Sequence, residues 1–223
     1  MIRTGTAAHA ASAGTEWTVA DLAERFGSLP AWRIRTDVAP GTATEEDVER
    51  TGPLCELING VLVEKAVSDY SDNIGALLMM FLSNYVVPRR LGWVHGPQGF
   101  FWLGADLRAP DASFTRKEQR PGGLLRRGYS DVAPALAAEV LSPGNTADEM
   151  ARKRAEFFAR GTELFWIVDP IARTIDVYTR PDRPDATLRD GDTLTGDPVL
   201  PGFSLPVRDL FDAAELSDEP ERA

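Results

Sequence analysis

The sequence has very few of the residues on which disulfide-bonded and zinc-binding folds depend. It contains one cysteine, Cys55, and two histidines among 223 residues. A single cysteine cannot form an internal disulfide and suits a reducing compartment, so we expect a cytoplasmic protein. With so few thiol and imidazole groups, a structural zinc site is not expected.

Long apolar runs are also missing. The longest largely apolar stretch, residues 74–87, is interrupted by Ser83 and Asn84 and does not reach the length of a membrane span. The N-terminus lacks the basic-then-apolar order of a secretory signal. These two absences predict that the protein has no membrane partner.

The sequence has fewer basic than acidic residues. The sequence has 24 Lys and Arg against 34 Asp and Glu, a formal net charge of −10. This balance argues against broad, non-specific binding to nucleic acid, so such binding would need a local basic surface. A hydrophobic content of 43% is ample for one buried core. We expect a disordered tail over residues 1–14, a single domain over 15–214 and a charged tail over 215–223.

The most informative stretch predicts a strand, a helix and a second strand. Residues 135–141 are small or apolar except for Glu139, and a turn follows them. Thr146 and Glu149 then have the spacing of a capping box, which marks the start of a helix. Residues 164–168 indicate another buried strand. Short connections between these elements predict parallel strands under a covering helix.

Glu139 is the exception within its strand. A carboxylate in a buried strand is costly to desolvate unless it binds a metal or pairs with a cation. The crossover brings the basic helix residues Arg152, Lys153 and Arg154 close to Glu139. Glu139 is therefore predicted to share a site with this helix.

The other segments predict elements that surround the central unit. Capping and periodicity patterns indicate helices, and alternating or apolar runs indicate strands. We expect a helix over residues 18–26, a helical turn near 44–50, a hairpin over 54–64 that turns at Asn59-Gly60, a core helix that is capped by Asp69 or Ser71, runs to about Val87 and is closed by Pro88 and Gly92, strands over 93–95, 99–103 and 174–178, and a last helical turn over 207–214.

Two acidic residues and one loop carry weaker signals. Taken alone, Glu56 is best interpreted as the solvent-facing residue of an alternating strand, and Pro110-Asp111 as a common turn pair. The loop over residues 115–130 is rich in glycine and arginine. It is either a solvated loop or a local phosphate-contacting patch. Its basic residues are Arg116, Lys117, Arg120, Arg126 and Arg127.

Several of these motifs, in this order, resemble the Uma-two family of restriction endonucleases, within the PD-(D/E)xK nuclease superfamily. The resemblance covers residues 18–211 and implies an α/β, restriction-endonuclease-like domain whose mixed sheet has a central strand–helix–strand crossover and is flanked by helices. The motifs are Glu56-Leu57-Ile58-Asn59-Gly60, Pro110-Asp111, Glu139-Val140-Leu141-Ser142-Pro143, Lys153 with Phe157 and Gly161, Phe165-Trp166-Ile167-Val168-Asp169, Gly191-Asp192-Thr193-Leu194 and Leu200-Pro201-Gly202-Phe203.

The resemblance also implies a catalytic site. It assigns Asp111 and Glu139 as metal-binding carboxylates, the backbone carbonyl of Val140 as a further ligand, Lys153 as the catalytic lysine and Glu56 as an additional acid. The implied metal is Mg²⁺, with Mn²⁺ as a substitute, because hard cations prefer oxygen ligands. Such a metal acts as a Lewis acid and lowers the pKa of bound water, while a lysine orients the nucleophile or stabilises the oxyanion.

Two positions depart from the superfamily pattern. Leu141 stands where the third motif carries lysine, so Lys153 on the following helix is its substitute. A helical wheel alone favours Arg154, which lies nearer the apolar stripe. Residues 69–71 stand where many relatives carry a histidine, and that role is not transferred. Glu149 has two interpretations, as a capping and i,i+4 ion-pair residue or as a catalytic acid.

The resemblance implies Mg²⁺-dependent hydrolysis of DNA phosphodiester bonds. It also implies a homodimer, because cutting a duplex needs two active sites. Two alternatives stay open. A catalytically inactive relative with a binding or regulatory role would keep its carboxylates in salt bridges. A metal-dependent hydrolase of a small phosphate ester would keep the site without a groove for a duplex. The acidic charge balance slightly favours these alternatives.

Overall fold

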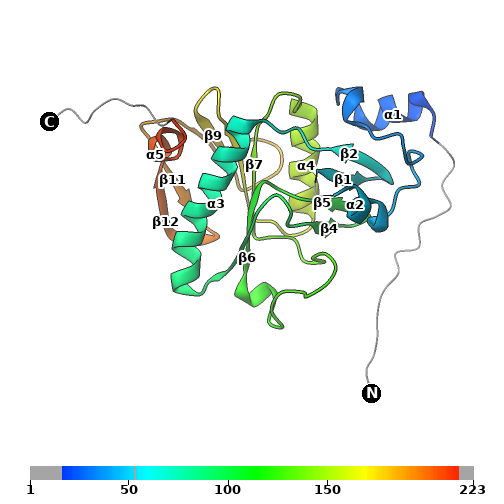
Figure 1. Ribbon diagram of the computed structural model, residues 1–223. Coiled ribbons are helices and arrows are strands. Elements are labelled where there is room, and N and C mark those ends of the chain that lie inside the picture. The colour runs from blue at the N-terminus through cyan, green and yellow to red at the C-terminus, as the bar shows by residue number, and fades with distance from the viewer. Residues whose placement is uncertain (1–16, 53, 216–223) are drawn as a thin grey trace, which may run out of the picture.

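The described part of the protein contains three β-sheets, of six, four and two strands, with helices on their faces (Figure 1). The computed structural model describes residues 17–52 and 54–215. The tail predicted over 1–14, and the tail predicted over 215–223 apart from Glu215, lie outside these residues. The helices are α1 (Val19–Phe26), α2 (Glu45–Thr51), α3 (Asp69–Arg89), α4 (Ala147–Ala159) and α5 (Val207–Asp212), with short 3₁₀ helices η1 (Ala31–Arg33) and η2 (Lys117–Gln119).

The larger sheet confirms the predicted central crossover. Its six strands lie in the order β10-β9-β8-β7-β6-β3, and β7 and β8 are parallel because α4 connects them. Its other neighbouring strands are antiparallel. The bounds are β3 (Gly92–His95), β6 (Ala112–Arg116), β7 (Leu136–Val140), β8 (Leu164–Asp169), β9 (Thr174–Tyr178) and β10 (Ala186–Leu188).

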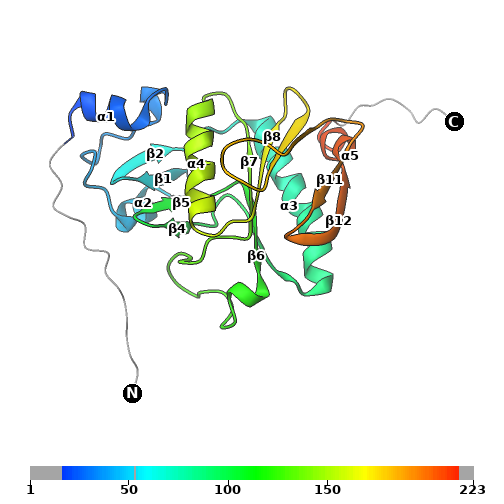
Figure 2. The same cartoon turned by 180° about the vertical axis from the view of Figure 1, so that it is seen from behind.

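The two faces of the larger sheet are covered by different helices, as the views of Figures 1 and 2 show. Alternation along β7 directs Leu136, Ala138 and Val140 into a core shared with α3 and α5. Ala137 points to the other face, where it packs against residues of α4. Glu139 has the same parity as Ala137 and therefore faces α4.

The smaller sheet has the order β2-β1-β5-β4 and is antiparallel throughout. The predicted hairpin is confirmed, because Asn59 and Gly60 both have the positive φ of a tight two-residue turn, 51° and 73°. A third sheet, formed by β11 and β12, covers the α3 side of the larger sheet. The bounds are β1 (Cys55–Ile58), β2 (Val61–Glu64), β4 (Phe101–Leu103), β5 (Asp106–Arg108), β11 (Thr193–Gly196) and β12 (Leu200–Pro206).

The helix ends agree with the sequence patterns except in α3. The capping boxes of α1 and α4 are both present. The capping residue predicted for α3, Asp69 or Ser71, is wrong, because the Ser68 hydroxyl caps the helix by accepting from the Ser71 N–H. Its predicted end is also two residues short: Pro88 lies inside the last turn, and the helix stops where Arg90 takes a left-handed φ of 53°. Within the described part of the chain, no helix is long and apolar enough to span a membrane.

Candidate active site

Asp111 and Glu139 meet at one edge of the larger sheet. Strands β6 and β7 pair with Ala112 opposite Ala138, and the same register extended by one residue places Asp111 opposite Glu139. The Val140 N–H donates to Asp111 Oδ2 at 2.9 Å, which fixes the Asp111 carboxylate at this edge. The strand pairing therefore brings together the two carboxylates that the resemblance assigned to a metal.

Lys153 lies between two of the predicted acids. Its Nζ is 2.7 Å from Glu139 Oε1 and 2.8 Å from Glu56 Oε1. Lys153 is only 2% exposed, and Glu56 is 3% exposed. The interpretation of Glu56 as solvent-facing is therefore wrong, because α4 covers that end of β1 with a cation. Arg154, which the helical wheel favoured, points elsewhere and lies 4.0 Å over the ring of Tyr178.

A buried charge network holds Glu56 in its ionised form. Arg108 Nη1 lies 2.9 Å from Glu56 Oε2, and the Ala109 N–H donates to Glu56 Oε1 at 2.9 Å. Arg108 also binds Glu156 of α4 at 2.7 Å, so the network ties the smaller sheet to this helix. Burial alone would raise the pKa of Glu56, but Lys153 and Arg108 more than offset it and hold that pKa at about 2.

Glu139 has the opposite electrostatic character. Burial raises its pKa to about 8, and Asp111 adds to the rise while Lys153 opposes it. Lys153 Nζ lies 2.7 Å from Glu139 Oε1, and no other donor among the described residues reaches this buried oxygen. Glu139 is thus a buried acceptor with unused capacity for a cation.

Lys65 is a site residue that the sequence reasoning missed. It follows β2 directly, and its Nζ lies 2.9 Å from Asp111 Oδ1 and 2.9 Å from the Ala109 carbonyl. One signal could have found it, because Lys65 is one of only three lysines in the chain, with Lys117 and Lys153. A residue type that is this rare marks positions to which arginine is not equivalent.

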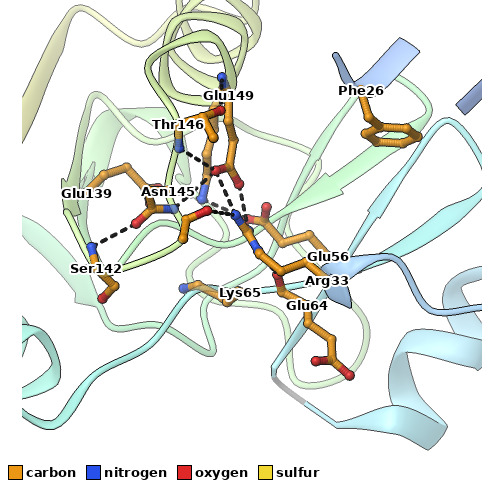
Figure 3. A network of polar contacts seen from close by, with 12 residues as sticks. Phe26, Arg33, Glu56, Glu64, Lys65, Glu139, Ser142, Asn145, Thr146 and Glu149 are labelled. Atoms are coloured by element: carbon orange, nitrogen blue, oxygen red, sulfur yellow. Dashed lines mark hydrogen bonds and ion pairs between the residues drawn. The ribbon is translucent and has the colours of Figure 1, made fainter. Parts of the chain in front are cut away.

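Arg33 of η1 supports the first turn of α4, and sequence reasoning missed it as well. Its guanidinium donates to Glu149 Oε2 at 2.8 Å and Oε1 at 2.7 Å, a bidentate pair. Figure 3 shows Arg33 reaching Glu149 with Asn145 beside them. Burial would raise the pKa of Glu149, but the Arg33 hydrogen bonds dominate and lower it. The predicted capping role of Glu149 is confirmed, and its ion-pair partner is Arg33 rather than Lys153.

The segment before β1 makes further contacts with α4. Arg152 donates to the carbonyl oxygens of Arg25 and Phe26, the latter at 2.7 Å, and the Ser28 hydroxyl donates to Asp148 at 3.2 Å. Together with the Arg33–Glu149 ion pair, these contacts hold residues 25–33 against α4, the helix that carries Lys153.

Two cavities adjoin the carboxylates. The smaller has a volume of about 10 Å³, roughly the room for one water or ion, and lies among Glu56, Glu139 and Lys153. The larger has a volume of about 200 Å³ and lies against the first turns of α3 and the segment after β2. Asp111 and Lys65 line both cavities, so they stand at the boundary between the enclosed charges and the open space.

Asp111 and Glu139 could hold Mg²⁺ only as an ion that keeps most of its water ligands. Across residues 17–52 and 54–215, no group of three or more His, Cys, Asp or Glu side chains is arranged to hold a metal ion. Mg²⁺, however, usually retains several waters and binds through one or two carboxylates together with substrate phosphates. Asp111 and Glu139 supply two carboxylates at one place, and the buried Glu139 Oε1 has Lys153 as its one partner among the described residues. The residues therefore fit a hydrated Mg²⁺ rather than an ion enclosed by protein ligands.

The Arg-rich loop does not gather around Asp111. Strand β6 runs away from Asp111, so Arg116 lies at the other end of the strand, about 16 Å away at the usual rise per residue. Arg116 pairs with Glu163, and Arg120 is largely buried and pairs with Asp131 at 3.0 Å. The other three predicted basic residues, Lys117, Arg126 and Arg127, are exposed.

Comparison with known proteins identifies the class. The structure resembles the crystal structure of a putative nuclease belonging to DUF820 from Anabaena variabilis, with a TM-score of 0.65 and 21% identity over 73% of this chain and 92% of that one. This likeness shows the restriction-endonuclease-like α/β fold. A model of the Uma2 family, described as "Putative restriction endonuclease", matches residues 43–208. The chain therefore belongs to the Uma2 family, which supports a nuclease. No curated protein matches it.

Proposed function

We propose that the protein is a metal-dependent endonuclease that hydrolyses the phosphodiester bonds of DNA. Family membership supports a nuclease. The observation that carries the proposal is the convergence of Asp111, Glu139 and Lys153, where the Lys153 ammonium is 2.7 Å from Glu139 Oε1. These are the carboxylates and the lysine that a PD-(D/E)xK site needs, brought from two strands and one helix.

Each residue has a separate task in this proposal. Asp111 and Glu139 would hold Mg²⁺, with the Val140 carbonyl as a further ligand. When bound, the metal supplies Lewis acidity and a water of lowered pKa. Lys153 neutralises Glu139 and Glu56 and keeps both carboxylates in fixed positions. Glu56, Glu139 and Lys153 are buried, and burial strengthens the charge interactions among them.

One observation favours a second candidate, a catalytically inactive nuclease-fold protein with a binding role. All three predicted acids are ion-paired: Asp111 with Lys65, Glu139 with Lys153, and Glu56 with both Lys153 and Arg108. A site whose carboxylates stay in such pairs would not admit a metal. The pairs to Asp111 and Glu139 are made by lysines, whose single ammonium groups are more easily displaced than a bidentate arginine.

A cleavage assay with a matched control tests the proposal. The purified protein is incubated with plasmid DNA, single-stranded DNA and a small phosphodiester, each with Mg²⁺, Mn²⁺ or chelator. We expect metal-dependent cleavage of DNA that Asp111→Asn reduces by more than about a hundredfold. Asp182→Asn, which makes the same change at an exposed loop position, should leave the rate unchanged.

The other outcomes separate the alternatives. Cleavage of the small ester alone would identify a hydrolase of small phosphate esters. DNA binding without cleavage under any metal would identify the inactive relative. Cleavage that persists in chelator, or in Asp111→Asn, would show that the proposed site is wrong.

A further inference from the structure

Lysine is confined to a few positions in this chain. Three of its 24 basic side chains are lysines, and arginine occupies the other basic positions, including buried ones such as Arg33 and Arg108. Two of the three lysines, Lys65 and Lys153, lie against the carboxylates of the candidate site, with side chains that are 7% and 3% exposed. An ammonium is a compact charge with three rotatable donors, whereas guanidinium is a planar fork. The site therefore uses a group that the rest of the chain avoids, and it uses this group twice.

The two site lysines differ in how many of their donors are already used. The Lys153 ammonium has three acceptors around it, Glu139 at 2.7 Å, Glu56 at 2.8 Å and the Ala109 carbonyl at 3.4 Å. The Lys65 ammonium makes two hydrogen bonds to described residues, to Asp111 and to the Ala109 carbonyl. Because an ammonium has three donors, Lys65 keeps one for a ligand and Lys153 does not.

The two lysines also differ in access. Lys153 lines only the cavity of about 10 Å³, whereas Lys65 lines both that cavity and the one of about 200 Å³. Lys65 is the one cation among the described residues that line the larger cavity, beside Asp72 and Asp111. A volume of about 200 Å³ is below the roughly 300–1,000 Å³ typical of drug-sized ligands, so it suits a single nucleotide unit.

We propose that Lys65 is the lysine that contacts the substrate, by donating to a non-bridging oxygen of a phosphate bound in the larger cavity. Lys153 is then a positioning residue, which fixes Glu56 and Glu139. This division of roles rests on the proposed function and refines it, because it assigns the substrate contact to a residue outside the motifs that carry the family resemblance. It also commits the larger cavity to one ligand class, a nucleotide phosphate.

Binding of a small probe in chelator tests the proposal without any cleavage. The probe is a nucleoside 3′,5′-bisphosphate, and its affinity is measured by calorimetry for the wild type and three variants. Lys65→Met should bind it at least about tenfold more weakly, because a charge-assisted hydrogen bond is lost. Lys153→Met should change the affinity by less than about threefold, because Lys153 does not line the larger cavity. Arg208→Met removes the same charge from exposed α5 and should change nothing.

Folding is checked for each variant by circular dichroism. If Lys153→Met does not fold, the double variant Glu139→Gln with Lys153→Met replaces it, since removing one carboxylate relieves the repulsion. The proposal is overturned if the wild type does not bind the probe, if Lys65→Met binds as well as the wild type, or if loss of Lys153 weakens binding as much as loss of Lys65.

A parallel cleavage assay keeps this inference distinct from the proposed function. Wild-type cleavage of DNA that is unchanged in Lys65→Met would refute the role of Lys65 and leave the endonuclease intact. A wild type that binds the bisphosphate through Lys65 but cleaves no DNA would refute the endonuclease and leave the nucleotide-phosphate site intact.

Discussion

Replacing Lys153 by methionine should destabilise the metal-free protein strongly, although the two side chains are similar in size. The Lys153 ammonium is 2% exposed and lies within 2.8 Å of two buried carboxylates, Glu56 and Glu139. Removing one partner of a buried ion pair costs about 3–5 kcal/mol. Protonation of Glu139, whose pKa is already about 8, relieves part of the repulsion, so we expect the lower end, about 3 kcal/mol.

This loss is large enough to measure in two ways. For a chain of this length, about 3 kcal/mol corresponds to a fall in Tm of roughly 6–12 °C. Urea unfolding in chelator, followed by tryptophan fluorescence to which buried Trp166 contributes, gives the free energy of unfolding. The double variant Glu139→Gln with Lys153→Met removes one of the two facing carboxylates and should lose less stability than the single variant. A loss below about 1 kcal/mol in Lys153→Met, or a less stable double variant, would refute the counter-ion role.

Three further predictions follow from the charges of the site and the loop. Glu139→Gln should abolish metal-dependent cleavage, yet leave the Tm in chelator unchanged or higher because a costly buried charge is removed; a severe fall would make Glu139 structural. The pKa of Glu149 is lowered below 4.5, so the stability that Glu149 contributes is present above that pH and is lost as the pH falls through the folded-state pKa. In Glu149→Gln, the free energy of unfolding should therefore fall less steeply with decreasing pH, as measured by urea unfolding between about pH 7 and 3. Replacing Arg126 and Arg127 by alanine should weaken DNA binding about equally for all sequences and reduce the slope of log affinity against log salt by about two, without affecting a small phosphodiester. An unchanged slope would make the loop a solvated surface.

The sequence predicted those parts of the fold that are specified by neighbouring residues. The capping box of α4 and the Asn59-Gly60 turn involve residues within three positions of each other, so their geometry follows from local chemistry. The crossover followed from strand lengths and short connections. The capping residue of α3 was predicted wrongly because Ser68, Asp69 and Ser71 are all good caps, and backbone geometry alone selects Ser68.

The site was less predictable because its contacts join distant segments. Asp111 and Glu139 came from the family resemblance, and the register of β6 with β7 brings them together. The local pattern, the helical wheel, favoured Arg154 over Lys153, because it does not show which side of α4 faces β7. Lys65 was not predicted because its partner, Asp111, lies 46 positions away in the sequence and next to a strand of the other sheet. Side chains that meet only in the tertiary structure leave no periodic signal in the sequence.

The attachment of residues 25–33 to α4 bears on how the protein can be shortened. The family match begins at residue 43, so a fragment cut to that boundary would omit Arg33 and the carbonyl groups that bind Arg152. Glu149 would then lie in the first turn of α4 without its bidentate partner, beside the helix residues that present Lys153. Boundaries taken from the family alone are thus unsuitable for crystallisation or fusion, and a truncated protein that fails to cut DNA would say nothing about its chemistry. The shortest useful fragment starts no later than the helix α1.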